Sequence, residues 1–361
     1  MDFLAEIVKP TGLWAKIIFG LEGGVGNYIL AIIIITVLVK LVLVPFDFIN
    51  RLITKKNTRK QAVLQPALEK IKRQYASNPQ MQNQKTMELY KRENYSVVGT
   101  CVGMLVYMVL TIVIFITLLG AMNNIAAYKM SQEYDAMRNV YEQTYTLEMA
   151  GETAESNPEA HEAATAKAEK AVVETYADIK NGFLWIKSIW RPDSWASSVL
   201  SWKDYYSSTR RVMSEPLTDE QLEIEKAEYE KVVTKSFEND TNGQYSKWNG
   251  LLILPILSIA LTYGSMKVTS LIAKIKAKKR GQQIIAGPEA GKGMQFIMPI
   301  MMGVFTLLYN AAFGLYIVAG AVVSFVTSPI INTIVDSIDY KKQLKEEDQR
   351  TVSYSRNRRR G

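Results

Sequence analysis

The stretch that decides the fold is YILAIIIITVLVKLVLVPF, residues 28–46, in which 19 positions carry a single charge. A second run, residues 97–120, carries no charge, and neither does a shorter third run, residues 250–266. From residue 296 to 335 the chain has 40 further residues without a charge. Because one membrane-spanning helix needs about 20 apolar residues, this last run predicts two spans, with a turn near residues 310–314. The sequence therefore predicts five transmembrane helices rather than the buried helices of a soluble protein.

The overall composition hides this pattern. The chain has 361 residues, 48% of them apolar, and a mean hydropathy near zero, because apolar runs alternate with strongly charged segments. Its single cysteine, Cys101, excludes a disulfide framework, and its single histidine, His161, excludes a Cys/His zinc cluster. We expect His161 to be a solvated residue of an Ala/Glu-rich stretch. With so few nucleophiles and bases, the composition favours a protein that is not an enzyme and that needs no metal or cofactor.

The charges of the polar segments predict the orientation. Three segments are basic, and they fall on one side of a five-span chain: residues 47–96 at +7, residues 267–295 at +6 and residues 336–361 at +3. The other side holds residues 1–27 at −1 and residues 121–249 at −8. Because short basic loops stay in the cytoplasm, we expect the N-terminus outside and the C-terminus inside a bacterial plasma membrane.

The segment between the first two spans predicts a basic helical hairpin. Leu64, Leu68, Ile71 and Tyr75 recur at helical spacing in residues 52–76. Ser77-Asn78-Pro79 then predicts a turn, and residues 80–93 predict a second helix with Met87 and Tyr90 on one face. The basic exterior either reflects the positive-inside rule alone or binds lipid head groups, ribosomal RNA or a nascent chain.

The outer segment also reads as helical. Residues 151–178 are rich in Ala and Glu, and Thr218 with Gln221 predicts a capping box. Residues 183–202 are dense in aromatic residues, which fits either a return to the bilayer surface or the core of an outer helical bundle. Residues 1–27 lack the features of a secretory signal, and they predict a short interfacial helix around Trp14.

The expected fold is thus an all-α polytopic membrane protein with a cytoplasmic hairpin and a mostly helical extracytoplasmic domain. Its parts, in order, are the outer N-terminal helix (1–27), the first span (28–46), the hairpin (47–96), the second span (97–120), the extracytoplasmic domain (121–249), the third span (250–266), a cytoplasmic basic loop (267–295), the fourth span (296–312), the fifth span (313–335) and a cytoplasmic basic tail (336–361).

Lys40 is the one charge inside a span. A cation within the bilayer is costly and usually faces a wet cavity, although a lysine two turns from the cytoplasmic end also reaches the interface by snorkelling. Polar side chains in the other spans favour a shared groove, although singly each is more often a helix–helix contact. Together with Lys40, the groove residues we predict are Thr100, Tyr107, Thr111, Ser258, Thr262, Tyr309 and Tyr316. No span holds an acidic residue, which argues against a proton-coupled pump.

These features together resemble the YidC/Oxa/Alb family of membrane protein insertases. Lys40 and Pro45 stand where the family's first span has an arginine five residues before a proline. The resemblance extends to LQPALEKIKRQY (64–75), QKTMELYKREN (84–94), FLWIKSIWRPD (183–193) and MPIMMGVFTLLYNAAFGLYIVAGAVVS (298–324). It covers most of the chain except about residues 125–180 and 205–245. The chain departs from the family at Asn94-Tyr95, Thr100-Cys101-Val102-Gly103, Tyr107 and Val109, where prolines or a glutamine are usual, so it looks like a divergent paralogue.

The resemblance implies a function without bond chemistry. A hydrated groove open to the cytoplasm and to lipid would hold Lys40, which would attract polar or acidic residues of a short client segment. Nascent membrane proteins are then the clients, with the ribosome, a translocon and anionic phospholipids as further partners, and with no role for DNA. The client or ribosome contacts that we predict are Lys55, Lys56, Arg59, Lys60, Lys70, Lys72, Arg73, Arg358, Arg359 and Arg360.

Two alternatives stay open at this point. One is an assembly scaffold that binds a partner through the outer domain, and the missing prolines favour it slightly. The other is a small-solute transporter, which would need inverted repeats or intramembrane binding residues, and the sequence shows no internal repeat.

Overall fold

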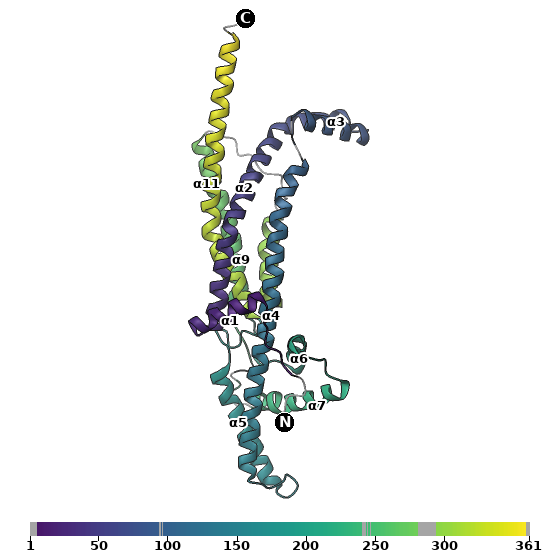
Figure 1. Cartoon of the computed structure of the whole chain (residues 1–361), viewed down its shortest axis with the longest axis vertical. Helices are drawn as coiled ribbons and strands as arrows, with labels where there is room; N and C mark the ends of the chain where they lie inside the picture. The colour runs from purple at the N-terminus through teal and green to yellow at the C-terminus, as the bar shows by residue number, and fades with distance from the viewer. Residues whose placement is uncertain are drawn as a thin grey trace. The chain divides into compact units, whose positions relative to one another are not determined.

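The computed structural model describes residues 6–93, 95, 97–239, 243, 245, 247–280 and 294–358, and it describes no side chains for residues 97–104, 294–295, 347 and 350–358. Helices make up nearly all regular structure in these residues, besides two isolated β-bridges (Figure 1). The elements are α1 (Leu13–Val25), α2 (Tyr28–Gln74), α3 (Pro79–Arg92), α4 (Val97–Met149), α5 (Pro158–Ile179), α6 (Trp202–Thr209), η1 (Arg210–Val212), α7 (Asp219–Tyr229), η2 (Glu230–Thr234), α8 (Lys235–Glu238), α9 (Ile253–Lys279), α10 (Met294–Leu308) and α11 (Ala311–Arg358). The predicted all-α polytopic fold class is confirmed.

Four helices of the described residues are long and apolar enough to cross a membrane. They contain Tyr28–Gln74, Leu105–Met149, Ile253–Lys279 and Ala311–Glu346. The fourth expected span corresponds to α10, a shorter apolar helix of 15 residues. At 1.5 Å per residue α10 is about 22 Å long, which is less than the hydrocarbon core of a typical bilayer. The count of five spans therefore stays a prediction.

Several helices continue past the limits that composition predicts. The first span and the first arm of the hairpin form one helix, α2, with Pro45 and Pro66 inside it. The fifth span likewise continues into the tail within α11, which is 48 residues long. The reason is physical: a change from apolar to charged side chains changes the surrounding solvent, but it does not interrupt the backbone hydrogen bonds of a helix.

The hairpin forms where the sequence places it. Asn78 caps α3 by accepting a hydrogen bond from the Met81 amide at 3.1 Å, with Pro79 at the first helical position. Its core contains Leu64, Leu68 and Leu89. Met87, expected on the packed face, is 57% exposed, so the packed face of α3 is set by Leu89 and Tyr90 instead.

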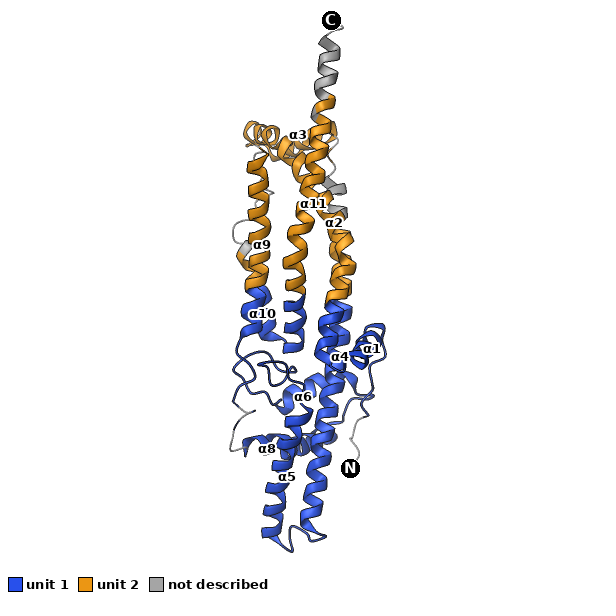
Figure 2. Ribbon diagram, turned by 90° about the vertical axis from the view of Figure 1, so that its left-hand side faces the viewer, with its two compact units in different colours: residues 1–36, 115–259, 300–319 blue, residues 37–114, 260–299, 320–361 orange. Residues whose placement is uncertain are grey.

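The chain divides into two compact units, each containing pieces from distant parts of the sequence (Figure 2). Unit 1 contains residues 1–36, 115–259 and 300–319. Unit 2 contains residues 37–114, 260–299 and 320–361. Both units therefore contain parts of the apolar helices together with a polar region.

The polar region of unit 1 is a helical domain with an aromatic core. The rings of Tyr134, Tyr205 and Tyr229 pack with centroids 4.7–5.2 Å apart, and all three residues are buried. The capping box of Thr218 and Gln221 is present at the start of α7. The prediction for His161 is confirmed in that its side chain is exposed, and its Nδ1 atom lies 2.8 Å from the Tyr145 hydroxyl.

The aromatic stretch 183–202 contributes to a protein core, as one of the two predictions has it, whereas its return to the bilayer surface stays a prediction. Trp190 is buried, donates a hydrogen bond to Glu133 at 2.8 Å and packs against Tyr28. Trp195, five residues later, is 71% exposed. The stretch therefore contributes to the core of this helical domain, which we call the outer domain after its predicted side of the membrane, and it also presents aromatic surface.

Candidate functional site

Lys40 lies on α2 within unit 2, half-buried between the buried side chains of Val39 and Leu43. In the described part of the chain no side chain forms an ion pair or hydrogen bond with it. Asp47 lies two turns further along α2, but its two carboxylate oxygens accept hydrogen bonds from Arg51 Nε at 2.9 and 3.0 Å. Asp47 attracts the Lys40 ammonium electrostatically, but its carboxylate is paired with Arg51, so Lys40 forms no ion pair of its own within the described residues.

Unit 2 also contains four of the other predicted groove residues. Thr111 is half-buried, and its hydroxyl donates to the Tyr107 carbonyl at 2.8 Å, one turn back on α4. Thr262 is half-buried on α9, and Thr100 lies on α4 with its side chain outside the described residues. The Thr111 hydroxyl is thus occupied by its own helix, as is common for threonine in apolar helices.

The remaining three groove residues lie in unit 1. Ser258 is fully buried, and its hydroxyl donates to the Pro255 carbonyl at 2.8 Å, which satisfies it within α9. Tyr316 packs against Phe115 and Phe313 with centroids 6.0 Å apart in each case. Tyr309 is 42% exposed at the break between α10 and α11, where Asn310 Oδ1 accepts from the Phe313 amide. That break confirms the turn expected there, whereas a single groove containing all eight residues stays a prediction.

Part of the predicted basic contact surface is engaged within unit 2. Lys55 forms an ion pair with Asp336 at 2.6 Å, and Arg59 forms ion pairs with Asp339 at 3.2 Å and Glu346 at 3.4 Å. These contacts join the polar part of α2 to the polar part of α11. Lys55 and Arg59 therefore already form ion pairs within the folded chain. The sequence did not predict these pairs.

The other predicted contact residues differ in their exposure. Lys56 and Lys60 line a cavity of 600 Å³ between α2, α11 and the segment after α3. Lys70, Lys72 and Arg73 are exposed near the end of α2. The side chain of Arg358 and all of Arg359 and Arg360 lie outside the described residues. The prediction that these groups contact clients or ribosomes stays untested.

A second arrangement, which sequence reasoning missed, lies where the outer domain meets the apolar helices of unit 1. We call residues 188–193 the capping loop. Asp193 is fully buried, and its carboxylate accepts hydrogen bonds from the backbone amides of Leu252 at 3.0 Å and Leu254 at 2.7 Å. It also accepts from Trp185 Nε1 at 3.1 Å. A carboxylate at this position satisfies free amides of the first turn of α9 and complements the positive end of its dipole.

The capping loop also holds the first turn of α11. The backbone amides of Ala311 and Ala312 donate to the carbonyls of Arg191 at 2.9 Å and Ile189 at 3.1 Å. Two apolar helices distant in sequence therefore begin on the same six-residue loop. This loop fixes the ends of α9 and α11 relative to each other without needing water to satisfy their amides.

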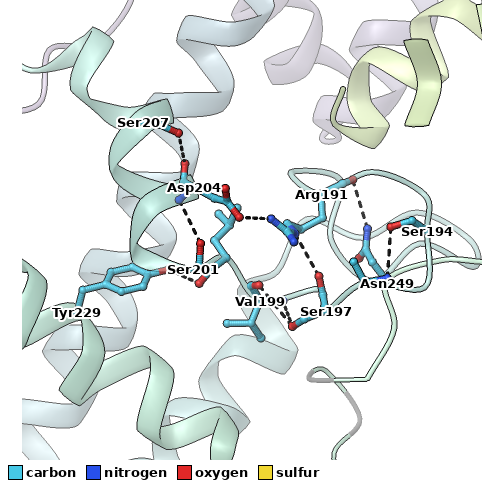
Figure 3. A network of polar contacts seen from close by, with 11 residues as sticks. Arg191, Ser194, Ser197, Val199, Ser201, Asp204, Ser207, Tyr229 and Asn249 are labelled. Carbon is cyan, nitrogen blue, oxygen red and sulfur yellow. Dashed lines mark hydrogen bonds and ion pairs between the residues drawn. The ribbon is translucent and has the colours of Figure 1, made fainter. Parts of the chain in front are cut away.

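Asn249 and Arg191 hold the capping loop in place (Figure 3). Asn249 is fully buried; its Oδ1 accepts from the Ser188 amide at 2.8 Å, and its Nδ2 donates to the carbonyls of Ser188 and Pro192 at 2.9 Å each. The Arg191 guanidinium pairs with Asp204 at the start of α6 and donates to the Ser197 carbonyl at 3.1 Å. The polar side chains of Asn249 and Arg191 thus bind backbone and side-chain groups that would otherwise leave the loop unsupported.

Sequence patterns gave no direct signal for this loop. The residues that meet are far apart, as Ser188 and Asn249 are separated by 61 positions. Gly250 was the nearest clue, because a side chain there would overlap the Asp193 carboxylate. The RPD at 191–193 belonged to the stretch that resembles known insertases, but its role depends on helix ends that only the folded chain brings together.

Comparison with known proteins agrees with this architecture. The family described as "60Kd inner membrane protein" matches residues 20–338. The chain is 41% identical over 114 residues to a membrane protein insertase YidC of Fusobacterium nucleatum, which covers 32% of this chain and 49% of that protein. It is 28% identical over 127 residues to a YidC of Clostridium perfringens, which covers 32% and 52% respectively. The aligned part thus spans about half the length of these relatives.

Proposed function

This chain belongs to the 60Kd inner membrane protein family, which confirms the resemblance read from its sequence, and on that premise we propose that it acts as a membrane protein insertase. It is a multi-pass membrane protein whose similar curated relatives carry the name insertase. The observation that carries the proposal is Lys40, a half-buried lysine that forms no ion pair or hydrogen bond in the described part of the chain, inside a helix apolar enough to span the membrane.

In the proposed mechanism Lys40 lowers the cost of bringing a polar client segment into the bilayer. A charged side chain in the membrane is unfavourable by a few kcal/mol, and a cation in a hydrated groove offsets this by attracting acidic or polar client groups. The client's own apolar helix then partitions into lipid, and burial of its apolar surface drives the reaction. This activity makes and breaks no covalent bond.

The groove that we propose is open to the cytoplasm and to lipid. Tyr107, Thr111 and Thr262, which lie in the same unit as Lys40, supply half-buried polar edges along the predicted spans. A client segment would therefore enter from the cytoplasmic side, where the hairpin and tail carry their excess of positive charge.

The test compares variants of Lys40 in proteoliposomes. The client is a single apolar helix with a short tail that carries one aspartate. We expect Lys40→Ala to reduce insertion of this client by about tenfold if the lost attraction is about 1.4 kcal/mol, and we expect Lys40→Arg to retain it. Lys91→Ala is the matched control, because it removes an exposed lysine of the same unit that lies outside the spans and outside the predicted contact residues.

The outcome also decides between the insertase and the scaffold. Insertion that is unchanged in Lys40→Ala would contradict the groove mechanism. If deletion of residues 121–249 abolished partner co-purification while Lys40 variants stayed active in cells, the protein would be an assembly scaffold. The specific observation behind that second candidate is the compact outer domain with its hydrogen-bond network around Asn249 and Arg191.

A further inference from the structure

A tight turn on the outer domain carries an exposed leucine in an unusual backbone conformation. Phe183 and Ile186 exchange both backbone hydrogen bonds, at 2.8 and 2.9 Å, so that Leu184 and Trp185 form the tip of a two-residue turn. Leu184 has φ of +52°, and 78% of its surface is exposed. Glycine, asparagine or aspartate normally occupies such a position, because a bulky side chain is strained there.

The unfavourable backbone conformation of Leu184 is not offset by packing of its side chain inside the protein. A leucine that is buried recovers stability through packing, but Leu184 has little contact and lies at a conformationally costly position. Water is also a poor environment for such a side chain. The unfavourable conformation and the exposed position together indicate that the Leu184 side chain contacts another molecule.

Three other exposed apolar residues lie in segments that are joined to this turn by hydrogen bonds, since the Lys187 amide donates to the Asn249 carbonyl at 3.0 Å. Trp248 lines the same hollow as Leu184 and is 38% exposed. Trp195 and Leu251, at 71% and 50% exposure, flank a backbone pairing in which the amides of Asn249 and Gly250 donate to the Ser194 carbonyl. We call these four residues, Leu184, Trp195, Trp248 and Leu251, the outer apolar patch.

The patch is continuous with the start of an apolar helix. Asp193, adjacent to this pairing, binds the amides of Leu252 and Leu254 at the start of α9. In the first turns of α9, Ile256 is 61% exposed, as expected for a helix surface that faces lipid. The patch therefore lies where the chain passes from the outer domain into the membrane.

The chemistry of the patch fits an interface between lipid and water. Tryptophan is enriched at this level of a bilayer, because its ring is apolar while its N–H stays hydrogen-bonded. The Lys187 ammonium lies 3.5 Å from the centre of the Trp248 ring, which places a cation at the edge of the patch, where phosphate groups would lie.

We propose that the outer apolar patch is a membrane anchor, in which Leu184 and Trp195 insert into the lipid surface beside α9. The anchor holds the outer domain against the bilayer at its junction with the capping loop. This inference does not depend on the proposed insertase activity, because it concerns only how unit 1 meets lipid.

The test places a fluorophore at single cysteines in the full-length protein in vesicles, after Cys101→Ser removes the one natural cysteine. Leu184→Cys is the probe site, and Leu147→Cys is the matched control, because Leu147 is 79% exposed on the same unit. Leu147 lies about 40 Å beyond Gly120 along α4, well outside the apolar run. Trp195→Cys provides a second probe site in case the first variant folds poorly.

We expect a lipid-borne nitroxide near the headgroups to quench the probe at 184, and aqueous iodide to quench it only weakly. The probe at 147 should show the reverse pattern. Equal iodide quenching at 184 and 147 without lipid quenching would overturn the proposal. Protection of 184 from both quenchers in these pure lipid vesicles would also overturn it, in favour of a protein contact.

Discussion

Tyr205 and Tyr229 show how differently two neighbouring residues of one type stabilise the outer domain. Their rings stack with centroids 4.7 Å apart, and both side chains are buried. The Tyr229 hydroxyl donates to the Leu200 carbonyl at 3.0 Å, whereas the buried Tyr205 hydroxyl has no hydrogen-bond partner within the described residues. The two hydroxyls therefore differ in their contribution to the free energy of unfolding.

Replacing each tyrosine by phenylalanine tests this difference. We expect Tyr229→Phe to lower the free energy of unfolding by about 1–3 kcal/mol, because a buried carbonyl loses its donor. Tyr205→Phe should leave stability unchanged or increase it, because it removes a buried polar group that forms no bond. Thermal unfolding of the purified protein in detergent measures both, and equal losses in the two variants would contradict this account.

Asp193 is the residue on which the capping loop depends most. Asp193→Asn places an amide opposite three N–H donors and loses the charge that complements α9, so we expect a loss of about 2–3 kcal/mol. Asp178→Asn is the control, since Asp178 is an exposed aspartate of the same unit. Comparable unfolding midpoints for the two variants would show that the cap contributes little.

At the residue scale, the sequence predicted which residues are unusual better than it predicted which groups they contact. Lys40 was singled out by its charge in an apolar run, and the structure describes it as half-buried. Ser258 was also singled out as a polar residue in a span, but its hydroxyl is satisfied within its own helix. Asp193 and Asn249 were assigned no role, because their partners lie far away in the chain.

At the scale of elements, the ion pairs between α2 and α11 are the contacts most open to test. The side chains of Arg59 and Asp339 are only 17% and 10% exposed, so solvent screens this pair less than a surface pair. Arg59→Glu should lower the unfolding temperature and make the polar part of α11 more sensitive to protease. The charge-swapped pair, Arg59→Glu with Asp339→Arg, should recover at least part of the loss.

A double-mutant cycle gives the size of this interaction. We expect a coupling of about 1 kcal/mol or more, since the two residues are in contact. Effects of the two single variants that simply add, with no recovery in the double variant, would mean that the pair does not hold α2 and α11 together.

Helix positions were readable from the sequence, but helix ends were not always. The hairpin turn at Asn78 and the break at Asn310 were predicted, because residues such as asparagine and proline mark them in the sequence. In the structure, both asparagine side chains accept hydrogen bonds from nearby backbone amides. The continuity of α2 and α11 was not, because a boundary between lipid and water leaves no mark on backbone hydrogen bonding. On α3, Leu89 rather than Met87 packs, a difference of two residues that composition does not resolve.

At the scale of the whole molecule, charge is distributed by segment. The first hairpin carries +7 and the outer segment −8, so the orientation prediction follows from the positive-inside rule. Division of the chain into two units, by contrast, was not visible in the sequence, because each unit combines three separate stretches. Local patterns predict elements, whereas units arise from packing between distant segments.

Orientation is testable with two cysteine variants in the Cys101→Ser background. Residue 147 lies at the end of α4 and residue 72 near the end of α2, and both are exposed. A thiol reagent that does not cross membranes should label Leu147→Cys in intact cells and should label Lys72→Cys only after lysis. Labelling of residue 72 in intact cells would reverse the predicted topology.

The central claim is that the charge of Lys40 attracts the client, and a charge exchange tests it most directly. Insertion is measured in proteoliposomes for two clients that differ only in carrying an aspartate or a lysine in the translocated tail, with wild-type protein and with Lys40→Glu. We predict that wild type favours the aspartate client and that Lys40→Glu favours the lysine client. The same order of clients with both proteins would contradict the account.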